Sequence, residues 1–221
     1  MVERLASADV ARGALLLALR QAGVRDVDVL RAIETVPREN FTPFALRDLA
    51  QRNCPLPIAC GQTMEAPGDL AEIFEALQLD PTHRVMEIGA GSGYSAAVLS
   101  RLVKEVVAFE RFRSLSLEAC ARLEQSGVRN VEIHCADGLA GPERFGRFDR
   151  IIVYARLPAP DARLPAPYAR LLGALAPNGL MFCALPEGLA ENRNPESPDE
   201  NAGRDVERAA GNAHLVRNHH A

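Results

Sequence analysis

The fold is decided by the stretch Val85-Met86-Glu87-Ile88-Gly89-Ala90-Gly91-Ser92-Gly93-Tyr94. Residues 84–88 are short, apolar and suited to a buried parallel strand, and residues 95–103 carry apolar side chains at helical spacing. The three glycines between them allow a tight turn and let a ligand approach the start of the helix closely. The stretch therefore predicts a strand, a turn and a helix that together hold a nucleoside cofactor.

The spacing of these glycines argues against a dinucleotide. They follow the pattern G-x-G-x-G, whereas folds for NAD and FAD carry G-x-G-x-x-G, in which the third glycine serves helix packing. A glycine triplet alone is equally consistent with a tight turn that binds nothing. Residues elsewhere in the chain must separate these two interpretations.

Two later strand ends carry polar groups suited to a nucleoside. Residues 105–109 predict the next strand, which delivers Glu110, and a carboxylate there suits the hydroxyls of a ribose. Residues 130–135 predict a third strand, which ends in Ala136-Asp137-Gly138 and places an acceptor and bare backbone beside an adenine amine. Taken singly, Glu110 could be a solvated charge and Asp137-Gly138 a plain turn. Their positions at successive strand ends of one sheet favour the nucleoside site.

These motifs together resemble the Rossmann-like methyltransferases that use S-adenosylmethionine, and further segments narrow the resemblance. In order and spacing the chain is similar to the protein-L-isoaspartate O-methyltransferase family over residues 29–185. The segments that carry this similarity are Val36-Pro37-Arg38-Glu39-Asn40-Phe41-Thr42-Pro43, Leu56-Pro57-Ile58, Gly61-Gln62-Thr63, Gly93-Tyr94, Ala96-Ala97-Val98-Leu99 and Phe148-Asp149-Arg150-Ile151-Ile152-Val153.

The resemblance implies a Rossmann-like, doubly wound α/β sheet and a repair activity. The expected reaction is methyl esterification of the α-carboxyl of L-isoaspartyl residues in damaged proteins or peptides. The glycine turn would bind the methionine end of S-adenosylmethionine, Glu110 the ribose and Asp137 the adenine. The full set of expected cofactor-binding residues is Glu87, Gly89, Gly91, Ser92, Gly93, Tyr94, Glu110, Arg111, Asp137 and Gly138.

The segment 53–69 is expected to be the substrate loop, because it is rich in proline and glycine. In the resembled family the equivalent loop presents small hydroxyl residues to the substrate carboxylate. The family's pattern Gly-Gln-Thr-Ile-Ser occurs here as Gly61-Gln62-Thr63-Met64-Glu65. We therefore expect Thr63 to supply the remaining hydroxyl, and Glu65 to stand at the position of the serine. Methyl transfer to a carboxylate needs alignment and exclusion of water more than acid–base help.

Because of Glu65, the sequence does not decide which molecule accepts the methyl group. An ionised carboxylate there would repel a substrate carboxylate by about 1–4 kcal/mol, unless Glu65 instead caps the helix predicted over residues 68–79. The segment Tyr154-Ala155-Arg156-Leu157-Pro158, in place of small residues of the family, would fill the substrate side of the site or change its charge. Alternatives to isoaspartyl repair are a methyltransferase for another small carboxylate or peptide, and a module that binds S-adenosylmethionine without catalysis. Arg38 is expected at the surface or in a salt bridge, or paired with a carboxylate substrate in the cleft.

The composition excludes several other classes. The chain has 25 Lys and Arg against 29 Asp and Glu, a net charge of −4, which gives no electrostatic basis for binding nucleic acid or an anionic membrane. The 5 cysteines form no C-x-x-C pair, which favours a reduced, cytoplasmic setting. The longest apolar run, residues 14–19, is too short to span a bilayer, and no metal-ligand spacing is found.

We expect one domain over residues 1–185, with helices over residues 1–52, one of them capped by Asp26, and a sheet of five strands. Residues 186–221 are polar, with few clustered apolar side chains, and are predicted to be a disordered tail. The methyltransferase fold usually ends in two further strands, which this composition does not predict. The fifth strand, residues 180–185, would then be an exposed edge that favours association into oligomers.

Overall fold

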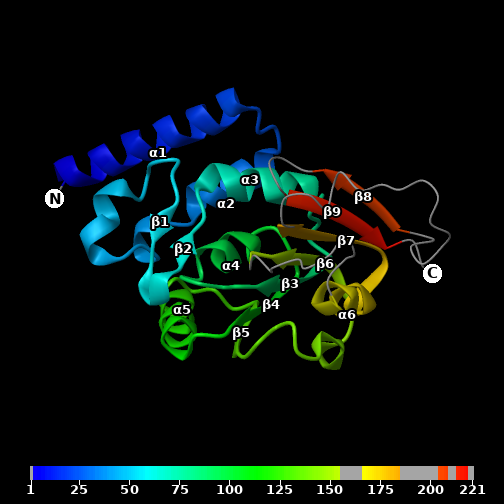
Figure 1. The fold of residues 1–221 in the computed structure, drawn as a ribbon. Helices are drawn as coiled ribbons and strands as arrows, with labels where there is room; N and C mark the ends of the chain where they lie inside the picture. Colours follow the sequence, from blue (N-terminus) through cyan, green and yellow to red (C-terminus); the bar gives the residue numbers. More distant parts are fainter. Residues whose placement is uncertain (1, 155–165, 185–203, 209–212, 219–221) are drawn as a thin grey trace.

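A seven-stranded sheet forms the centre of the molecule (Figure 1). The computed structural model describes residues 2–154, 166–184, 204–208 and 213–218. The strand order is β5-β4-β3-β6-β7-β9-β8; β9 is antiparallel to β7 and β8, and the other pairs are parallel. The bounds are β3 Arg84–Ile88, β4 Glu105–Glu110, β5 Val131–Cys135, β6 Phe148–Val153, β7 Leu175–Ala184, β8 Arg204–Arg208 and β9 Ala213–Asn218. The predicted α/β class with a mainly parallel sheet is confirmed.

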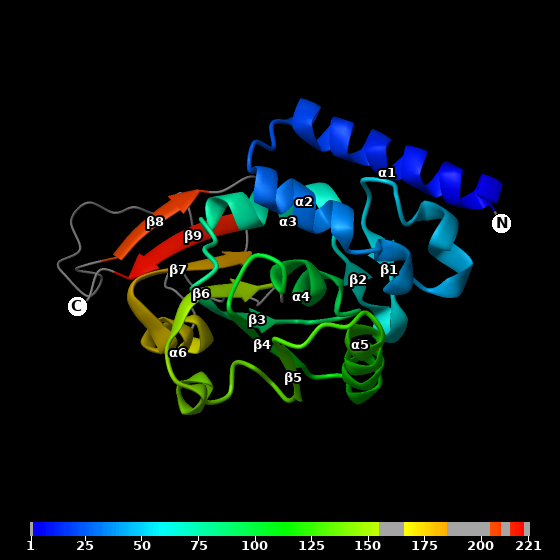
Figure 2. The same cartoon turned by 180° about the vertical axis from the view of Figure 1, so that it is seen from behind.

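Helices cover both faces of this sheet. Figure 1 and Figure 2 show α2, α3 and α4 over one face and α6 on the other. The bounds are α1 Val2–Ala22, α2 Val27–Thr35, α3 Pro67–Ala76, α4 Tyr94–Leu99, α5 Arg113–Gln125 and α6 Ala166–Ala174, with 3-10 turns η1 Arg38–Asn40, η2 Phe44–Leu49, η3 Ala59–Gly61 and η4 Pro142–Phe145. Within the region 1–52 that was expected to be helical, the segment η2 is a 3-10 helix and not an α-helix.

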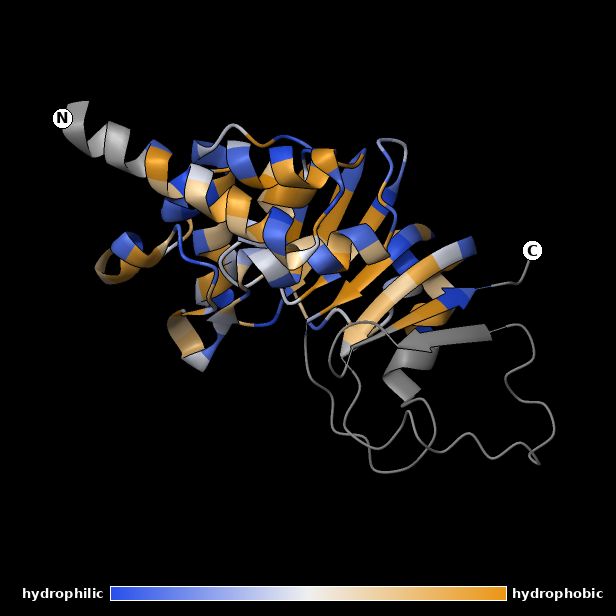
Figure 3. Ribbon diagram, turned by 90° about the horizontal axis from the view of Figure 1, so that it is seen from above, coloured by the Kyte–Doolittle hydropathy of each residue, from blue (hydrophilic) through white to orange (hydrophobic). Residues whose placement is uncertain are grey.

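Alternate residues of the central strands supply two separate cores, because successive side chains of a strand point to opposite faces. On one face, Val85 and Ala108 pack with side chains of α2, α3 and α4. On the other face, Met86 and Phe109 pack with Leu171 of α6. The strands are accordingly apolar along most of their length (Figure 3), as expected for a parallel sheet covered on both faces.

The C-terminal hairpin is present, which corrects the expectation that it is missing. β9 pairs with β7, from Arg217 opposite Leu180 to Ala213 opposite Ala184, and β8 pairs with β9. The predicted disordered tail is therefore wrong for residues 204–208 and 213–218, and the rest of 186–221 lies outside the described residues. A short polar segment can form such a strand because backbone hydrogen bonds to a neighbour do not require apolar side chains.

The hairpin also changes which strands are edges. β7 lies between β6 and β9, so the fifth strand of the predicted sheet is not the exposed edge that we expected, and the edges are β5 and β8. β7 begins at Leu175, earlier than the strand expected over residues 180–185, and its pairing with β6 contains a register shift. There Leu175 stands opposite Phe148, whereas Leu180 stands opposite Arg150, and Asn178 has a φ of 60°.

The N-terminal region packs as a helical layer above the sheet (Figure 2). Asp26 caps α2 as predicted, because its Oδ1 accepts from the backbone N–H of Asp28 at 2.8 Å and of Val29 at 3.1 Å. Leu15 and Leu19 of α1 are buried in the same core as α2. Within the described part of the chain, no helix has both the length and the apolar character needed to cross a membrane.

Candidate active site

The glycine turn lies at the carboxyl end of β3 and is bound to β4. The backbone N–H groups of Gly89 and Ala90 donate to the Phe109 carbonyl at 2.9 and 3.1 Å. Gly93 precedes α4 with a φ of 85°, and a Cβ there would stand 3.1 Å from the Cβ of Ala119. A side chain at position 93 would therefore meet both an unfavourable backbone conformation and α5.

Glu110 fixes the turn from the end of β4. Its side chain is buried, and its Oε2 accepts from the Gly91 N–H at 2.9 Å while its Oε1 accepts from the Phe112 N–H at 2.9 Å. Each carboxylate oxygen retains a second lone pair that can accept from a ligand. Glu110 is therefore both a support of the glycine turn and an acceptor at the cavity wall.

A cavity of about 530 Å³ opens beside this turn and brings most of the predicted site residues together. Its lining includes Gly89, Gly91, Glu110, Arg111, Asp137, Gly138, Thr63 and Glu65. A smaller cavity of about 30 Å³ adjoins it and is lined by Ser92 and Tyr94, among others. Glu87 and Gly93 line neither cavity and lie behind the surface of the site.

The end of β5 supplies the far wall. Asp137 is exposed, and its Oδ1 accepts from the backbone N–H of Leu139 at 3.0 Å, which closes a local turn. Gly138 is buried so closely that an added Cβ would stand 2.8 Å from the Cβ of Phe109 and 3.0 Å from Cγ1 of Ile88. The wall at this point is therefore bare backbone, against which a flat ring can lie.

The substrate loop is more ordered than a plain loop. β1 (Leu56–Pro57) pairs with β2 (Thr63–Met64) in a short antiparallel ladder around η3. This arrangement places exposed Thr63 and half-buried Glu65 on the wall of the larger cavity, opposite the sheet. Glu65 is not the N-cap residue of the following helix, because α3 begins at Pro67 with Ala66 as its N-cap. Asn53, which the sequence did not indicate, accepts from the Gly68 N–H through Oδ1 at 2.7 Å.

Arg38 is buried rather than at the surface, and no salt bridge from it is found within the described part of the chain. Its Nη1 donates to the carbonyls of Ala50 at 3.2 Å and Arg52 at 3.0 Å. Its Nη2 donates to the carbonyls of Cys54 and Glu65, each at 2.9 Å. Burial lowers the pKa of this guanidinium, which nevertheless remains charged at neutral pH. Arg38 thus joins both ends of the substrate loop.

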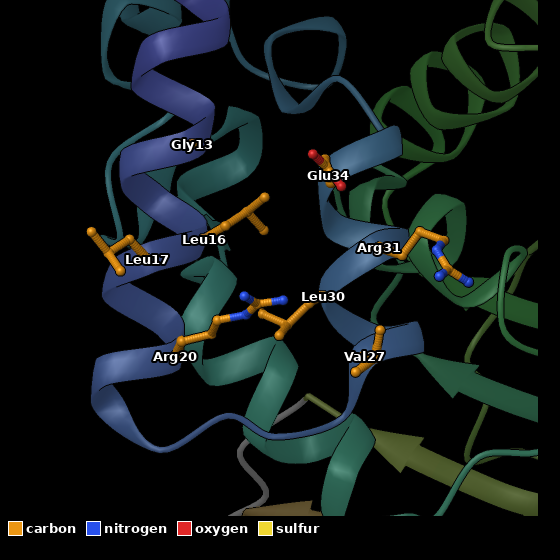
Figure 4. A pocket seen from close by; sticks show the side chains of 8 residues that line it. All are labelled: Gly13, Leu16, Leu17, Arg20, Val27, Leu30, Arg31 and Glu34. Carbon is orange, nitrogen blue, oxygen red and sulfur yellow. The ribbon is translucent and has the colours of Figure 1, made fainter.

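A second groove lies between α1 and α2, away from the glycine turn (Figure 4). It measures about 400 Å³. Leu16, Leu30 and Arg20 point into the space between α1 and α2, whereas the Arg31 side chain points away from α1 (Figure 4). None of the predicted site residues lines this groove, whereas most of them line the cavity at the strand ends.

The family model of protein-L-isoaspartate(D-aspartate) O-methyltransferase matches residues 11–181. The chain belongs to this family. Among its relatives, protein-L-isoaspartate O-methyltransferase 2 of Rhodopseudomonas palustris (strain HaA2) is 49% identical over 78% of this chain and 76% of the relative. A protein-L-isoaspartate O-methyltransferase of R. palustris (strain BisB5) is 48% identical over 80% of this chain and 77% of the relative.

Solved structures agree with this assignment. One protein-L-isoaspartate O-methyltransferase is 28% identical, with a TM-score of 0.67 over 79% of this chain and 55% of that chain. A structure from Plasmodium falciparum, in complex with S-adenosyl-L-homocysteine, is 20% identical and shares the fold, with a TM-score of 0.66 over 92% of each chain. The chain is therefore a methyltransferase of the Rossmann-like, S-adenosylmethionine-dependent kind.

The cavity of this methyltransferase fits the cofactor in size and in chemistry. A volume of about 530 Å³ lies within the range of small-molecule sites. The carboxylates of Glu110 and Asp137 are acceptors for hydroxyl and amine groups, and Gly138 contributes backbone without a side chain to the lining. Arg111 is exposed beside Glu110 and also lines the cavity.

Glu87 lies beneath the glycine turn and is fully buried. Burial raises the pKa of its carboxyl to about 8, with a further increase from Glu110 and an opposing effect of the Ser95 hydroxyl. Neither carboxyl oxygen has a well-aligned hydrogen-bond partner among the described residues, because Ser95 bonds to Tyr154 instead. A buried acid without a hydrogen-bond partner destabilises the fold, so the Glu87 carboxyl is an unsatisfied polar group behind the glycine turn.

A metal site is not formed by the described residues, where no group of three His, Cys, Asp or Glu side chains gathers. His134 instead stacks on Phe109, with ring centroids 5.3 Å apart. The 5 cysteines are all free thiols.

Proposed function

We propose that this chain methylates the α-carboxyl of L-isoaspartyl residues in damaged proteins and peptides. The observation that carries the proposal is one cavity that joins the glycine turn and Glu110 to Thr63 and Glu65 of the substrate loop. Membership of the isoaspartyl methyltransferase family supports the acceptor, since the matched residues 11–181 include both the turn and the loop.

We assign the cofactor-binding roles along the strand ends. The turn from Gly89 to Tyr94, supported by Glu87 and Glu110, would hold the methionine end and the ribose. Asp137 and Gly138 would hold the adenine, and Arg111 would close the cavity beside the ribose. Support for these roles comes from the shared cavity lining and from the hydrogen bonds that Glu110 accepts from the backbone N–H groups of Gly91 and Phe112.

S-adenosylmethionine supplies a methyl group on a positively charged sulfur. The acceptor carboxylate oxygen forms a bond to that methyl carbon while the carbon–sulfur bond breaks and its electron pair stays on sulfur. No proton moves in this step, so the protein needs to align the groups and to exclude water. The Thr63 O–H would donate a hydrogen bond to the acceptor carboxylate, and the ladder of β1 and β2 would close the cavity above it.

Glu65 sets the electrostatics of the acceptor side. Its ionised carboxylate would oppose an acceptor carboxylate by about 1–4 kcal/mol, so it is expected to weaken acceptor binding rather than to assist transfer. The other candidate acceptors, a small carboxylate or a different peptide, rest on this residue and on Tyr154. A protein that binds S-adenosylmethionine without transfer is the remaining alternative.

Methyl transfer to matched peptides tests the proposal. The purified chain is incubated with radiolabelled S-adenosylmethionine and either an isoaspartyl peptide or the same peptide with aspartate, and binding of S-adenosyl-L-homocysteine is measured in parallel. A base-labile methyl ester on the isoaspartyl peptide supports the proposal. Binding without transfer would move the assignment to another acceptor or to a non-catalytic module.

We also propose a cytoplasmic location and no nucleic-acid partner. The free thiols support a reducing compartment, and the net charge of −4 gives no attraction to a polyanion.

A further inference from the structure

Tyr154 stands on the sheet side of the cavity, at a position that the backbone fixes. It directly follows β6, and its N–H donates to the Ile88 carbonyl at 3.0 Å, which extends the pairing of β6 with β3. Because β3 and β6 are parallel, this point lies at the same edge as the glycine turn. The side chain of Tyr154 therefore begins beside the cofactor cavity.

A hydroxyl pair holds the phenol in place. The Tyr154 oxygen lies 2.6 Å from Oγ of Ser95, the second residue of α4. Ser95 is itself buried, so its hydroxyl is shielded from water. A phenol has one proton to donate and lone pairs to accept with. When Ser95 donates to the phenol oxygen, the phenol proton is available to a group in the cavity.

Tyr154 lines both the larger and the smaller cavity. The residues shared by the two linings are Thr63, Glu65, Gly89, Gly91 and Tyr154. Thr63 and Glu65 come from the loop and the glycines from the turn, so Tyr154 is the shared side chain that the sheet provides. It therefore faces the loop residues across the place where acceptor and methyl donor must meet.

The electrostatic surroundings keep the phenol protonated. Burial raises its pKa, the charge of Glu87 raises it further, and Glu65 adds to the increase, while the Ser95 hydrogen bond opposes it. Tyr154 is thus an O–H donor at neutral pH rather than a phenolate.

We infer that the Tyr154 hydroxyl binds the acceptor carboxylate from the sheet side. Its O–H would donate a hydrogen bond to the carboxylate oxygen that does not attack, which leaves the other oxygen aligned with the methyl group. The ring would form the wall that keeps water from the reacting atoms. Ser95 is then a positioning residue, because it acts on the acceptor through Tyr154. This inference rests on the proposed function, since it takes the isoaspartyl carboxylate as its ligand.

Tyr154→Phe tests the hydrogen bond without removing the wall. We expect KM for the isoaspartyl peptide to rise about tenfold or more, as for loss of a hydrogen bond to a charged group. The value of kcat should change far less, and the Kd of S-adenosyl-L-homocysteine should stay within about twofold, because the cofactor retains its own contacts. Ser100→Ala is the matched control, because its hydroxyl on the same helical segment bonds the Ala97 carbonyl at 2.6 Å and lines neither cavity.

A double variant adds a readout that a structural role would not move. Glu65→Ser removes a carboxylate and adds a hydroxyl on the opposite wall. In the Tyr154→Phe background it should therefore lower KM most of the way back to the wild-type value. Turnover by the wild type with an unchanged KM in Tyr154→Phe would overturn the role of Tyr154 alone. An equal loss of cofactor affinity would also overturn it. Absence of isoaspartyl turnover in the wild type would overturn the proposed function and this inference together.

Discussion

The guanidinium of Arg38 donates to the carbonyl of Glu65 at 2.9 Å, across the base of the substrate loop. With its bonds to Ala50, Arg52 and Cys54, it holds the chain on both sides of the short ladder. A buried charge is tolerated here because convergent carbonyl dipoles replace its hydration. The geometry of the acceptor side therefore depends on a residue that touches no reacting atom.

Arg38→Lys should destabilise the fold by about 2–4 kcal/mol, because an ammonium cannot reach the same carbonyls and leaves some of them without a donor. Urea unfolding measures this loss. Arg52→Lys is the control, since the Arg52 side chain is exposed on the same loop and should change stability by less than about 0.5 kcal/mol. Equal stability of the two variants would contradict the role of Arg38 in holding the two ends of the substrate loop.

Glu110→Ala should weaken binding of S-adenosyl-L-homocysteine by about 10–100-fold, since the Gly91 and Phe112 N–H groups lose their acceptor and the turn loosens. Calorimetric titration measures this affinity. Glu124→Ala, an exposed position on α5, serves as the control. An unchanged affinity in Glu110→Ala would mean that the turn is held by other contacts.

Gly138→Ala should lower both stability and cofactor affinity. The added Cβ would stand 2.8 Å from Cβ of Phe109, which requires a shift of backbone and costs about 1–3 kcal/mol. Gly13→Ala places the same methyl group where no atom lies within 4 Å, and it should be neutral or stabilising. Thermal melts with and without S-adenosyl-L-homocysteine compare the two variants. A wild-type melting temperature and a wild-type shift with the ligand in Gly138→Ala would contradict close packing at this position.

Glu87→Gln should stabilise the unliganded protein as the pH rises. The carboxyl has a pKa of about 8 when folded and 4.5 as its ordinary value, so the folded state binds the extra proton between these values. The stability that this proton confers is present below about pH 4.5 and is lost as the pH rises through about 8.

Because glutamine does not titrate, the difference in unfolding free energy between Glu87→Gln and wild type should grow by about 2–5 kcal/mol from pH 5 to pH 8. Urea unfolding at both pH values measures it. Glu72→Gln, on the exposed side of α3, is the control and should run parallel to wild type. Parallel curves for Glu87→Gln as well would show that Glu87 does not carry the raised pKa.

The strands and the glycine turn could be predicted because each rests on local pattern. Apolar runs of five or six residues ended at glycine or acidic residues, and parallel pairing then brought Glu110 and Asp137 to one edge. α5 was not predicted, because much of its length faces solvent and its buried residues are few: Leu115, Ser116, Ala119 and Leu123. Such a helix shows little apolar periodicity in the sequence.

Other features depend on contacts between distant segments. The burial of Arg38 requires carbonyls from residues 50–65 to converge, and the Asn53 bond to Gly68 requires the loop to fold back on α3. The terminal hairpin was missed because β9 gains its place through pairing with β7, and its buried residues Val216 and Asn218 form no apolar run in the sequence. The Tyr154–Ser95 pair likewise joins β6 to α4.

The selectivity of methyl transfer by the wild-type chain tests the isoaspartyl assignment most directly. Paired peptides that differ only in an isoaspartyl or an aspartyl linkage are incubated with S-adenosylmethionine and analysed by mass spectrometry, with base treatment to release methanol. We predict a base-labile methyl ester on the isoaspartyl peptide and none on the aspartyl peptide. Equal methylation of both peptides, or no methylation by protein that binds S-adenosyl-L-homocysteine, would contradict the isoaspartyl assignment.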